Sequence, residues 1–348
     1  MTEPGAESQK LVERVLHDIG RRVRLATLDA IPDGEPHNWL YRLMRTYPSR
    51  PGKALRPTLC LSACRAFGGD EAAALPIAVA IELLHNAFLV HDDVADGSRL
   101  RRRGPTLPAE HGDALALNAG NALVVVAYQV LRRHARALGH SLSARVLDEF
   151  DAMALRTLEG QAMELGWRRD CVIDLAPEDY LDLIMHKTCW YTTIHPLRVG
   201  ALIGSGGAAD MRPLVRFGFL LGAAFQIRDD VLNLVGDADL YGKEINGDLY
   251  EGKRTLMLIH LASAADGQDR AAVAAYLATT QSLRTAGQVA EIRHLMDVYG
   301  SIDFAVEYGQ GLAQAAHDAF DDAFAQAQPG PDTDFLRALI PYMVGRRS

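Results

Sequence analysis

The sequence predicts an all-α fold, a single-domain helical bundle around a central apolar cavity. Along most of the chain the apolar residues recur at spacings of three and four, which is the helical period, and strand signals are nearly absent. Glycine and proline divide the chain into segments of about 12–30 residues, which suits helices. Of the 348 residues 49% are hydrophobic, enough for a large core. We expect residues 1–8 to be disordered and residues 9–348 to form the domain.

The first two predicted helices lie before residue 70. One covers residues 12–28, where a stripe at helical spacing consists of Val12, Val15, Leu16, Ile19, Val23 and Leu25. After turn signals around residues 32–34 and 48–52, Gly52–Lys53 and Arg56–Pro57 open the next helix. It carries Cys60 and Cys64 one turn apart on an apolar stretch. We interpret these as buried thiols, with metal binding or redox work as the less favoured alternative.

Two very apolar helices end in acidic residues. Residues 72–90 run into Asp92, Asp93 and Asp96 before Gly97, and residues 217–225 run into Asp229, Asp230 and Asn233 before Gly236. The first and last members of each cluster stand at i and i+4, so they share a helix face. Acids at a helix C-terminus oppose the macrodipole, and a bound cation would offset that cost. Oxygen ligands of this kind favour Mg²⁺ held together with phosphates, and a solvated helix end is the alternative.

Two other segments complete the predicted bundle. Residues 118–130 form a further apolar helix, and Pro196 interrupts a helical segment after Tyr191–His195, where we expect a kink. No GxxxxGK[ST], G-x-S-x-G or CxxC motif is found, and Gly204–Gly207 does not complete a dinucleotide-binding fingerprint.

The net charge and the hydropathy of the chain exclude some classes of binding partner. The chain has 36 basic and 44 acidic side chains, a net charge of −8, which argues against nucleic-acid binding. The longest apolar stretches carry charge or fall short of about 18 residues, so we expect no stable membrane insertion. The N-terminal residues lack the apolar region of a secretory signal, so we expect a cytoplasmic protein.

Basic residues flank both acidic clusters. Arg binds phosphate oxygens through two parallel N–H donors of its guanidinium, and Lys binds them as a point charge. In an acidic protein such cations indicate either salt bridges or diphosphate chemistry. The residues concerned are Lys53, Arg56, Arg101, Arg102, Arg103, Lys243 and Lys253.

Several segments together resemble one family, the trans-isoprenyl diphosphate (polyprenyl) synthases, across nearly the whole chain. GKALRP (52–57) is similar to the GKxxRP motif, and residues 82–106 resemble the first aspartate-rich motif with its trailing Arg pair. GQAMEL (160–165), HKT (186–188) and the two segments 225–237 and 242–253 resemble the later motifs in the right order. Three positions depart from the family pattern: Asn233 and Glu164 each replace an Asp, and Arg103 replaces the usual Gly.

The resemblance implies the isoprenyl synthase type of bundle and assigns roles to residues. Three Mg²⁺ ions, for which Mn²⁺ can substitute, would be held by Asp92, Asp96 and Asp229, with Asp93, Asp230 and Asn233 as weaker or indirect members of the metal set. The allylic diphosphate would contact Arg101, Lys187 and Lys243, with Lys253 more peripheral. Isopentenyl diphosphate would bind Lys53, Arg56, His85 and Arg102, although His85 alone could equally be a core histidine. Thr188 and Gln226 would present dipoles to the developing allylic cation.

The implied activity is trans-prenyl chain elongation, in which isopentenyl diphosphate condenses with an allylic diphosphate in a cavity that excludes water. The resemblance places the floor that stops elongation at Ala87 and Phe88, and a small residue beside a large one favours geranylgeranyl diphosphate, then farnesyl diphosphate. If Phe88 only packs in the core, Leu84 or a neighbouring helix would set the stop. The family resemblance also implies a homodimer.

Three other functions compete with this one. A class I terpene cyclase would share the fold but lack a second diphosphate site. A di-iron carboxylate bundle would use the ExxH pairs Glu82–His85 and Glu291–His294. A non-catalytic partner subunit would have lost part of the Asp and Lys/Arg set, which this chain keeps.

Overall fold

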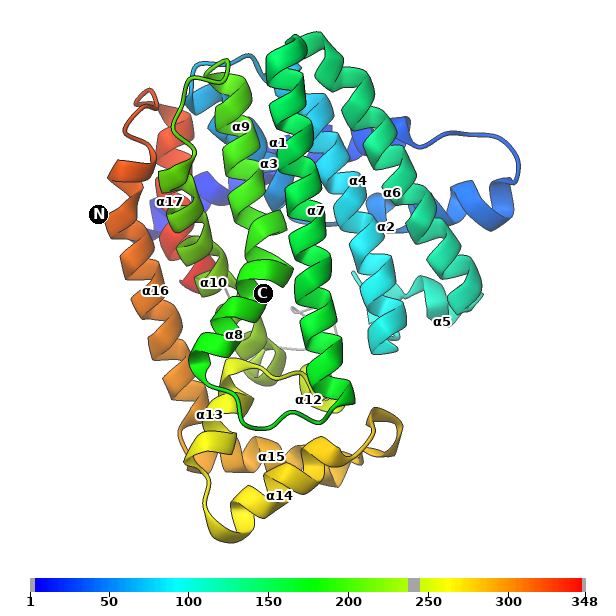
Figure 1. Cartoon of the computed structure of the whole chain (residues 1–348), viewed down its shortest axis with the longest axis vertical. Coiled ribbons are helices and arrows are strands. Elements are labelled where there is room, and N and C mark those ends of the chain that lie inside the picture. The colour runs from blue at the N-terminus through cyan, green and yellow to red at the C-terminus, as the bar shows by residue number, and fades with distance from the viewer. Residues whose placement is uncertain (1–3, 237–244, 346–348) are drawn as a thin grey trace. The chain divides into compact units, whose positions relative to one another are not determined.

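The computed structural model describes residues 4–236 and 245–345, and these residues are almost entirely helical (Figure 1). Within them the strands are limited to a two-residue antiparallel pair, β1 (Leu100–Arg101) and β2 (Gly104–Pro105). The predicted all-α bundle is confirmed. The chain divides into two compact units, which we describe separately.

Unit 1 comprises residues Met1–Ala152, Thr192–Phe217 and Ala319–Tyr342. Besides the hairpin, it contains these elements: α1 (Pro4–Ala30), the π-helical turn η1 (His37–Tyr41), α2 (Arg42–Ser49), α3 (Leu55–Ala66), α4 (Glu71–Asp96), α5 (Leu107–His111), α6 (Asp113–Ala135), the 3₁₀ turn η2 (Arg136–Leu138) and α9 (His195–Gly204). Helix α4 packs against α6 and α3, and α3 packs against α9.

Unit 2 comprises residues Met153–Tyr191, Gly218–Asp318 and Met343–Ser348. Its own elements are α8 (Pro177–Ile184), α12 (Gly247–Glu251), α13 (Leu256–Ala264), α14 (Gly267–Ala278), the 3₁₀ turn η4 (Gln281–Leu283) and α15 (Ala286–Val298). Five helices have residues in both units: α7 (His140–Arg169), the π-helix η3 (Met185–Ile194), α10 (Arg212–Val235), α16 (Ser301–Ala323) and α17 (Pro331–Gly345).

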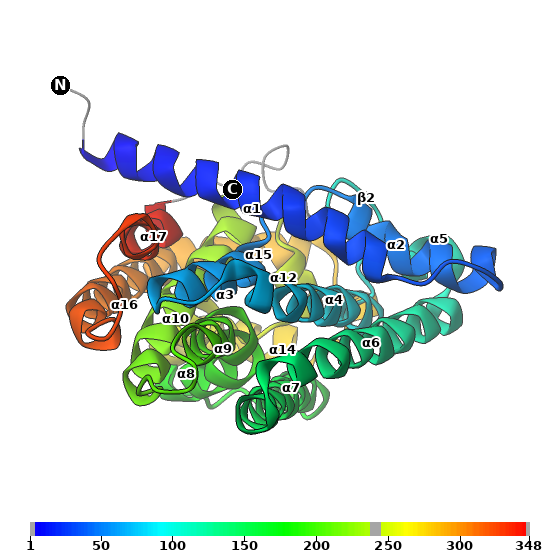
Figure 2. The same cartoon turned by 90° about the horizontal axis from the view of Figure 1, so that it is seen from above.

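Helix α1 begins at Pro4, inside the segment 1–8 for which the sequence predicted disorder, and Glu7 in its first turn suits the positive end of the helix dipole. The helix lies along α3 and α4 (Figure 2). Four residues of the predicted stripe, Val12, Leu16, Ile19 and Val23, are buried there. Leu25 is 62% exposed, because it lies off that face.

Helix α4 is the core helix of unit 1. Asp70 caps its N-terminus by accepting from Ala72 N at 2.9 Å, and Gly97 ends it in the left-handed conformation at φ 65°. By length and composition, α4 and residues 113–138 could each cross a membrane. However, 72% of the most apolar window of α4 is buried within the protein, as in the core helix of a soluble protein.

Three glycines allow α3 and its flanking residues to contact α9 backbone to backbone. A Cβ added at Gly200 would lie 2.3 Å from the carbonyl oxygen of Cys60, and one at Gly204 would lie 2.3 Å from that of Cys64. A Cβ at Gly69 would lie 2.5 Å from Gly204 Cα. Cys60 and Cys64 are fully buried at this contact, as predicted. We call Gly69, Gly200 and Gly204 the glycine contact.

The kink predicted at Pro196 has a different form. Pro196 occupies the first turn of α9, where its missing N–H costs little, and the ten residues before α9 form the π-helix η3. Such π-helical segments are rare and occur frequently at functional sites.

Candidate active site

The predicted isopentenyl diphosphate residues Arg56 and His85 meet in unit 1. Arg56 lies in the first turn of α3, and its Nη1 is 3.3 Å from Nε2 of His85 on α4. Its Nη2 donates to Oγ1 of Thr192 at 2.8 Å. Lys53 is exposed in the loop before α3. Thr192 was not predicted as a site residue, because no sequence motif marks it.

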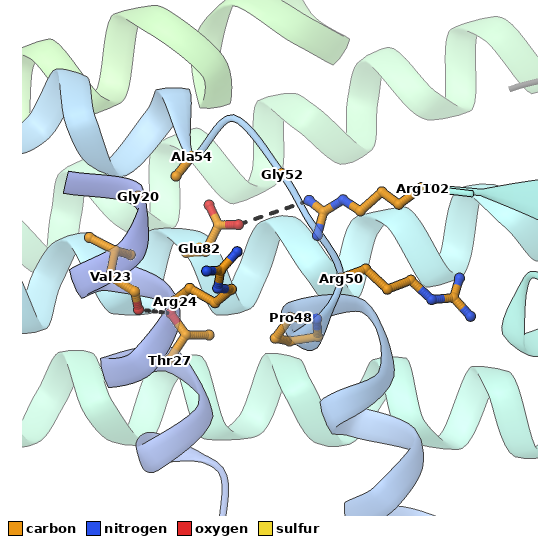
Figure 3. A pocket seen from close by; sticks show the side chains of 10 residues that line it. All are labelled: Gly20, Val23, Arg24, Thr27, Pro48, Arg50, Gly52, Ala54, Glu82 and Arg102. Carbon is orange, nitrogen blue, oxygen red and sulfur yellow. Dashed lines mark hydrogen bonds and ion pairs between the residues drawn. The ribbon is translucent and has the colours of Figure 1, made fainter. Parts of the chain in front are cut away.

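Arg102 approaches the same face of α4 from the β1–β2 hairpin. Its Nη1 donates to the Tyr47 carbonyl at 2.9 Å and to Asn86 Oδ1 at 3.3 Å. Its Nη2 lies 4.0 Å from Glu82 Oε1, across a pocket between α1, the loop of residues 48–54 and α4 (Figure 3). Burial raises the pKa of Glu82, while Arg102 and Arg56 act to lower it. The Glu82 carboxylate therefore lies among the cations of the predicted site.

Arg50 lies beside Arg102 but serves the hairpin. Its guanidinium points away from the pocket (Figure 3), and its Nη1 donates to the Arg101 carbonyl at 2.9 Å. No motif marks Arg50 in the sequence, because it precedes GKALRP (52–57).

Asp93 is the buried acceptor of this half of the site. Its carboxylate, 0% exposed, accepts from Arg101 Nε at 2.6 Å and from the Tyr47 hydroxyl. Although burial acts to lower it, the Asp93 charge raises the pKa of Arg101. Asp93 therefore holds Arg101, and we do not propose it as a direct metal ligand.

Asp92 and Asp96 lie in the last two turns of α4, which ends at Asp96 as the sequence predicted. Asp92 is half-buried and Asp96 is 3% exposed. The i,i+4 spacing places both carboxylates on one helix face. This face supplies two oxygen donors from unit 1.

The second acidic cluster lies on α10 in unit 2. Asp230 is buried and accepts from Tyr180 at 2.8 Å and from Gln226 Nε2 at 2.7 Å. Burial, followed by the charge of Asp248, raises the pKa of Asp230 to about 8. Asp229 is half-buried. Tyr180 was missed because no sequence signal distinguishes it from a core tyrosine.

Asn233 uses its side-chain oxygen within the fold. Its Oδ1 accepts from the backbone N of Asp248 at 3.1 Å, and its carbonyl accepts from Asn246 N at 2.8 Å. It thus holds the segment that leads into α12. We therefore leave Asn233 out of the metal set that we propose.

The structure brings Thr188 and Gln226 together, the two residues for which the same role was predicted. Thr188 Oγ1 donates to Gln226 Oε1 at 3.1 Å, and Gln226 in turn donates to Asp230. In this arrangement Gln226 Oε1 faces Thr188 and Gln226 Nε2 faces Asp230. Gln226 therefore links η3 to the acidic end of α10.

Lys187 lies one residue before Thr188, on η3. Its Nζ contacts Glu164 Oε1 at 2.6 Å, with both side chains largely buried. A Cβ added at Gly160, one turn earlier on α7, would lie 2.2 Å from the Lys187 backbone N, so only glycine allows this approach. Glu164, which departs from the family pattern, therefore orients Lys187.

Two predicted lysines follow the second acidic cluster, and the two residues of the predicted floor lie on α4. Lys253 pairs with Asp248 at 3.4 Å and with Glu251, and Lys243 lies outside the described residues. On α4, Ala87 is fully buried and Phe88 is half-buried.

The oxygen donors at the acidic ends of α4 and α10 suit a divalent cation. Among the residues that the structure describes, no three His, Cys, Asp or Glu side chains form a group able to hold a metal alone. Each acidic helix end instead offers its own carboxylates, as suits Mg²⁺, which is bound through one or two carboxylates plus substrate phosphates. The donor set therefore fits Mg²⁺ bound together with a diphosphate.

Comparison with known proteins assigns the chain to a family. The family model described as polyprenyl synthetase matches residues 37–296. The chain belongs to this family of prenyltransferases. Geranylgeranyl diphosphate synthase of Mycobacterium tuberculosis is 32% identical over 97% of this chain and 94% of its own. Octaprenyl diphosphate synthase of Escherichia coli K12 is also 32% identical, over 83% of each chain.

A solved structure gives the same result for the fold. Geranylgeranyl pyrophosphate synthase from Corynebacterium glutamicum, complexed with isoprenyl diphosphate and magnesium, is 26% identical. Its TM-score is 0.85, over 97% of this chain and 99% of that one. The two relatives above are equally identical to this chain, at 32%, but are named for products of different length. Overall sequence similarity therefore does not select a product length.

Proposed function

We propose that this chain is a Mg²⁺-dependent prenyltransferase that condenses isopentenyl diphosphate with an allylic diphosphate and releases geranylgeranyl diphosphate. The observation that carries this proposal is the hairpin, which directs two adjacent arginines along one side of α4. Arg101 pairs with Asp93 beside the Asp92–Asp96 face, and Arg102 lies among Asn86 and Glu82. Two diphosphates would each have their own guanidinium.

We assign the residues as follows. By the family resemblance Asp92, Asp96 and Asp229 would hold Mg²⁺, which when bound would act as a Lewis acid on the leaving diphosphate. Lys53, Arg56, His85 and Arg102 bind isopentenyl diphosphate. Arg101 and Lys187 bind the allylic diphosphate. Thr188 and Gln226 turn fixed dipoles toward the carbon where positive charge develops.

The reaction itself needs no side chain that acts as a general base. The allylic C–O bond breaks, the isopentenyl double bond attacks the allylic carbon, and a proton leaves from the new cation to the released diphosphate. The protein binds, orients and excludes water, since water would quench the cation.

The test is an assay of the purified chain with both substrates. Product should form only when isopentenyl diphosphate and Mg²⁺ are both supplied, and chelation should abolish it. Asp92→Ala should lower turnover by about three orders of magnitude, since it removes an interaction strengthened in the transition state. A class I terpene cyclase would instead consume the allylic diphosphate alone, and that result would reject the proposal.

Product length is tested separately at the predicted floor. Phe88 lies one turn from Asp92 on the same face of α4 and keeps partial exposure, whereas Leu84 is buried. Phe88→Ala should therefore lengthen the product while leaving the first condensation intact, and Leu84→Ala tests the alternative floor. Unchanged chain length in mass spectra of the Phe88 variant would move the floor elsewhere.

We further propose a homodimer formed through α6. Two large apolar side chains of this helix face solvent, Leu117 at 41% and Val125 at 54% exposure. Burying them in a second copy would remove apolar surface from water. An active species that sediments as a monomer at micromolar concentration would contradict this proposal.

A further inference from the structure

We propose that Tyr47 is a positioning residue for the two diphosphate-binding arginines, Arg101 and Arg102. Its hydroxyl orients Arg101 through Asp93, and its backbone carbonyl orients Arg102 directly. This inference rests on the proposed function, which assigns Arg101 to the allylic diphosphate and Arg102 to isopentenyl diphosphate. Tyr47 precedes the recognisable motifs, on α2, and its side chain is 1% exposed. No role at the site follows from its position in the sequence.

The hydroxyl of Tyr47 serves the Arg101 side. It donates to Asp93 Oδ2 and accepts from the Leu107 backbone N at 2.9 Å. Asp93 Oδ1 then accepts from Arg101 at 2.6 Å. The hydroxyl therefore fixes the carboxylate that fixes the guanidinium, and it also ties the chain just after the hairpin.

The backbone carbonyl of Tyr47 serves the Arg102 side. It accepts from Arg102 Nη1 at 2.9 Å. The same guanidinium reaches Asn86 Oδ1, while Asn86 Nδ2 donates to the Glu82 carbonyl at 2.7 Å and contacts Glu82 Oε1 at 3.3 Å. Arg102 is thus held by α4 as well, independently of the Tyr47 hydroxyl.

The hairpin needs such external support. Its two-residue turn consists of Arg102 at φ 50° and Arg103 at φ 60°, left-handed conformations that favour Asn or Gly. Only two ladder positions join β1 to β2, Leu100 with Pro105 and Arg101 with Gly104. A ribbon this short is not stable alone, so the contacts of Tyr47, Asp93, Arg50 and Asn86 hold it in place.

The two atoms predict separable effects. Tyr47→Phe removes the hydroxyl but keeps the carbonyl, so the KM for the allylic substrate should rise about tenfold, as for a lost hydrogen bond to a charged group. The KM for isopentenyl diphosphate should stay within about twofold. Asn86→Ala should reverse this pattern, because it loosens Arg102 and leaves the Asp93 pair intact. Tyr41→Phe, the same substitution on η1, is the matched control and should change neither KM.

A purely structural role would not give this selectivity. We therefore add a double-mutant cycle with Arg101→Lys: if Tyr47 acts through Arg101, the two allylic KM effects should be strongly non-additive. Should Tyr47→Phe fail to fold, Asp93→Asn keeps an acceptor for the hydroxyl while removing the charge on which Arg101 depends. It should give the same rise in allylic KM.

The outcomes separate the inference from the function beneath it. An active wild-type chain whose Tyr47→Phe and Asp93→Asn variants raise both KM values equally, or neither, overturns the role of Tyr47 and leaves the proposed function standing. Additive effects with Arg101→Lys overturn it as well. A folded wild-type chain that never condenses the two substrates overturns both.

Discussion

Replacing Asp93 and Asp92 by alanine should change the stability of the protein by very different amounts, although the two residues are adjacent. Asp93 is 0% exposed and Arg101, its partner, is 10% exposed at the side chain. Asp93→Ala leaves a buried guanidinium without its carboxylate, which costs about 3–5 kcal/mol. It also removes the acceptor of the Tyr47 hydroxyl, worth about 1 kcal/mol more. We expect the free energy of unfolding to fall by about 5 kcal/mol.

That loss can be measured by calorimetry and by denaturant titration. With an unfolding entropy of about 2 cal/mol/K per residue, it corresponds to a fall in Tm of about 7 °C. Asp92 is half-buried at the end of α4, so Asp92→Ala should change the unfolding free energy by less than about 1 kcal/mol while lowering turnover by about three orders of magnitude. Equal destabilisation by the two variants would refute the division between a positioning and a metal-binding aspartate.

Three further predictions concern stability. Arg103→Gly should stabilise the protein by about 0.5–1 kcal/mol, because glycine relieves the left-handed strain at φ 60° at a smaller entropic cost; a lower Tm would show that the arginine makes a compensating contact. Gly200→Ala should destabilise by about 2–3 kcal/mol, since its Cβ would lie 2.3 Å from the Cys60 carbonyl, whereas Gly311→Ala on α16, with open space around it, should stabilise by about 1 kcal/mol. Burial lowers the pKa of His195 to about 4, so the unfolded chain binds the extra proton between about pH 6.5 and 4, and about 3 kcal/mol of stability should be lost as the pH falls through that window. His195→Gln should make the unfolding free energy less dependent on pH in this window. An unchanged dependence on pH would show that His195 is not the group responsible.

The sequence predicted the helices and the spacing within each motif, because both depend on local periodicity. The i,i+4 pairs on α4 and α10 and the end of α4 at Gly97 illustrate this. It did not predict the partners that fix these side chains. Tyr47 reaches Asp93 across 46 residues, and Tyr180 reaches Asp230 across 50, through packing that no pattern along the chain encodes.

Other differences arise from hydrogen-bond register. The π-helix before Pro196 changes the backbone pairing of residues whose sequence still has a helical composition, so the pattern alone suggests only a kink. The link from Asn233 to the segment leading into α12 is another feature of this kind, because Asn233 Oδ1 accepts from the backbone N of Asp248 at 3.1 Å. The acidic motif carries no information about that contact.

The glycine contact has a consequence for how unit 1 fluctuates. Where α3 and α9 meet backbone to backbone, no side chain can rearrange to let water in, so the amides of residues 60–64 should exchange with solvent only through large-scale opening. The hairpin at residues 100–105 has two ladder positions and side-chain supports, so its amides should exchange through small local openings. We therefore expect the backbone that carries Arg56 to open rarely, whereas the hairpin depends on side-chain contacts such as those of Asp93 and Tyr47 rather than on its own ladder. Ligand-dependent protection from exchange should appear first at the hairpin amides.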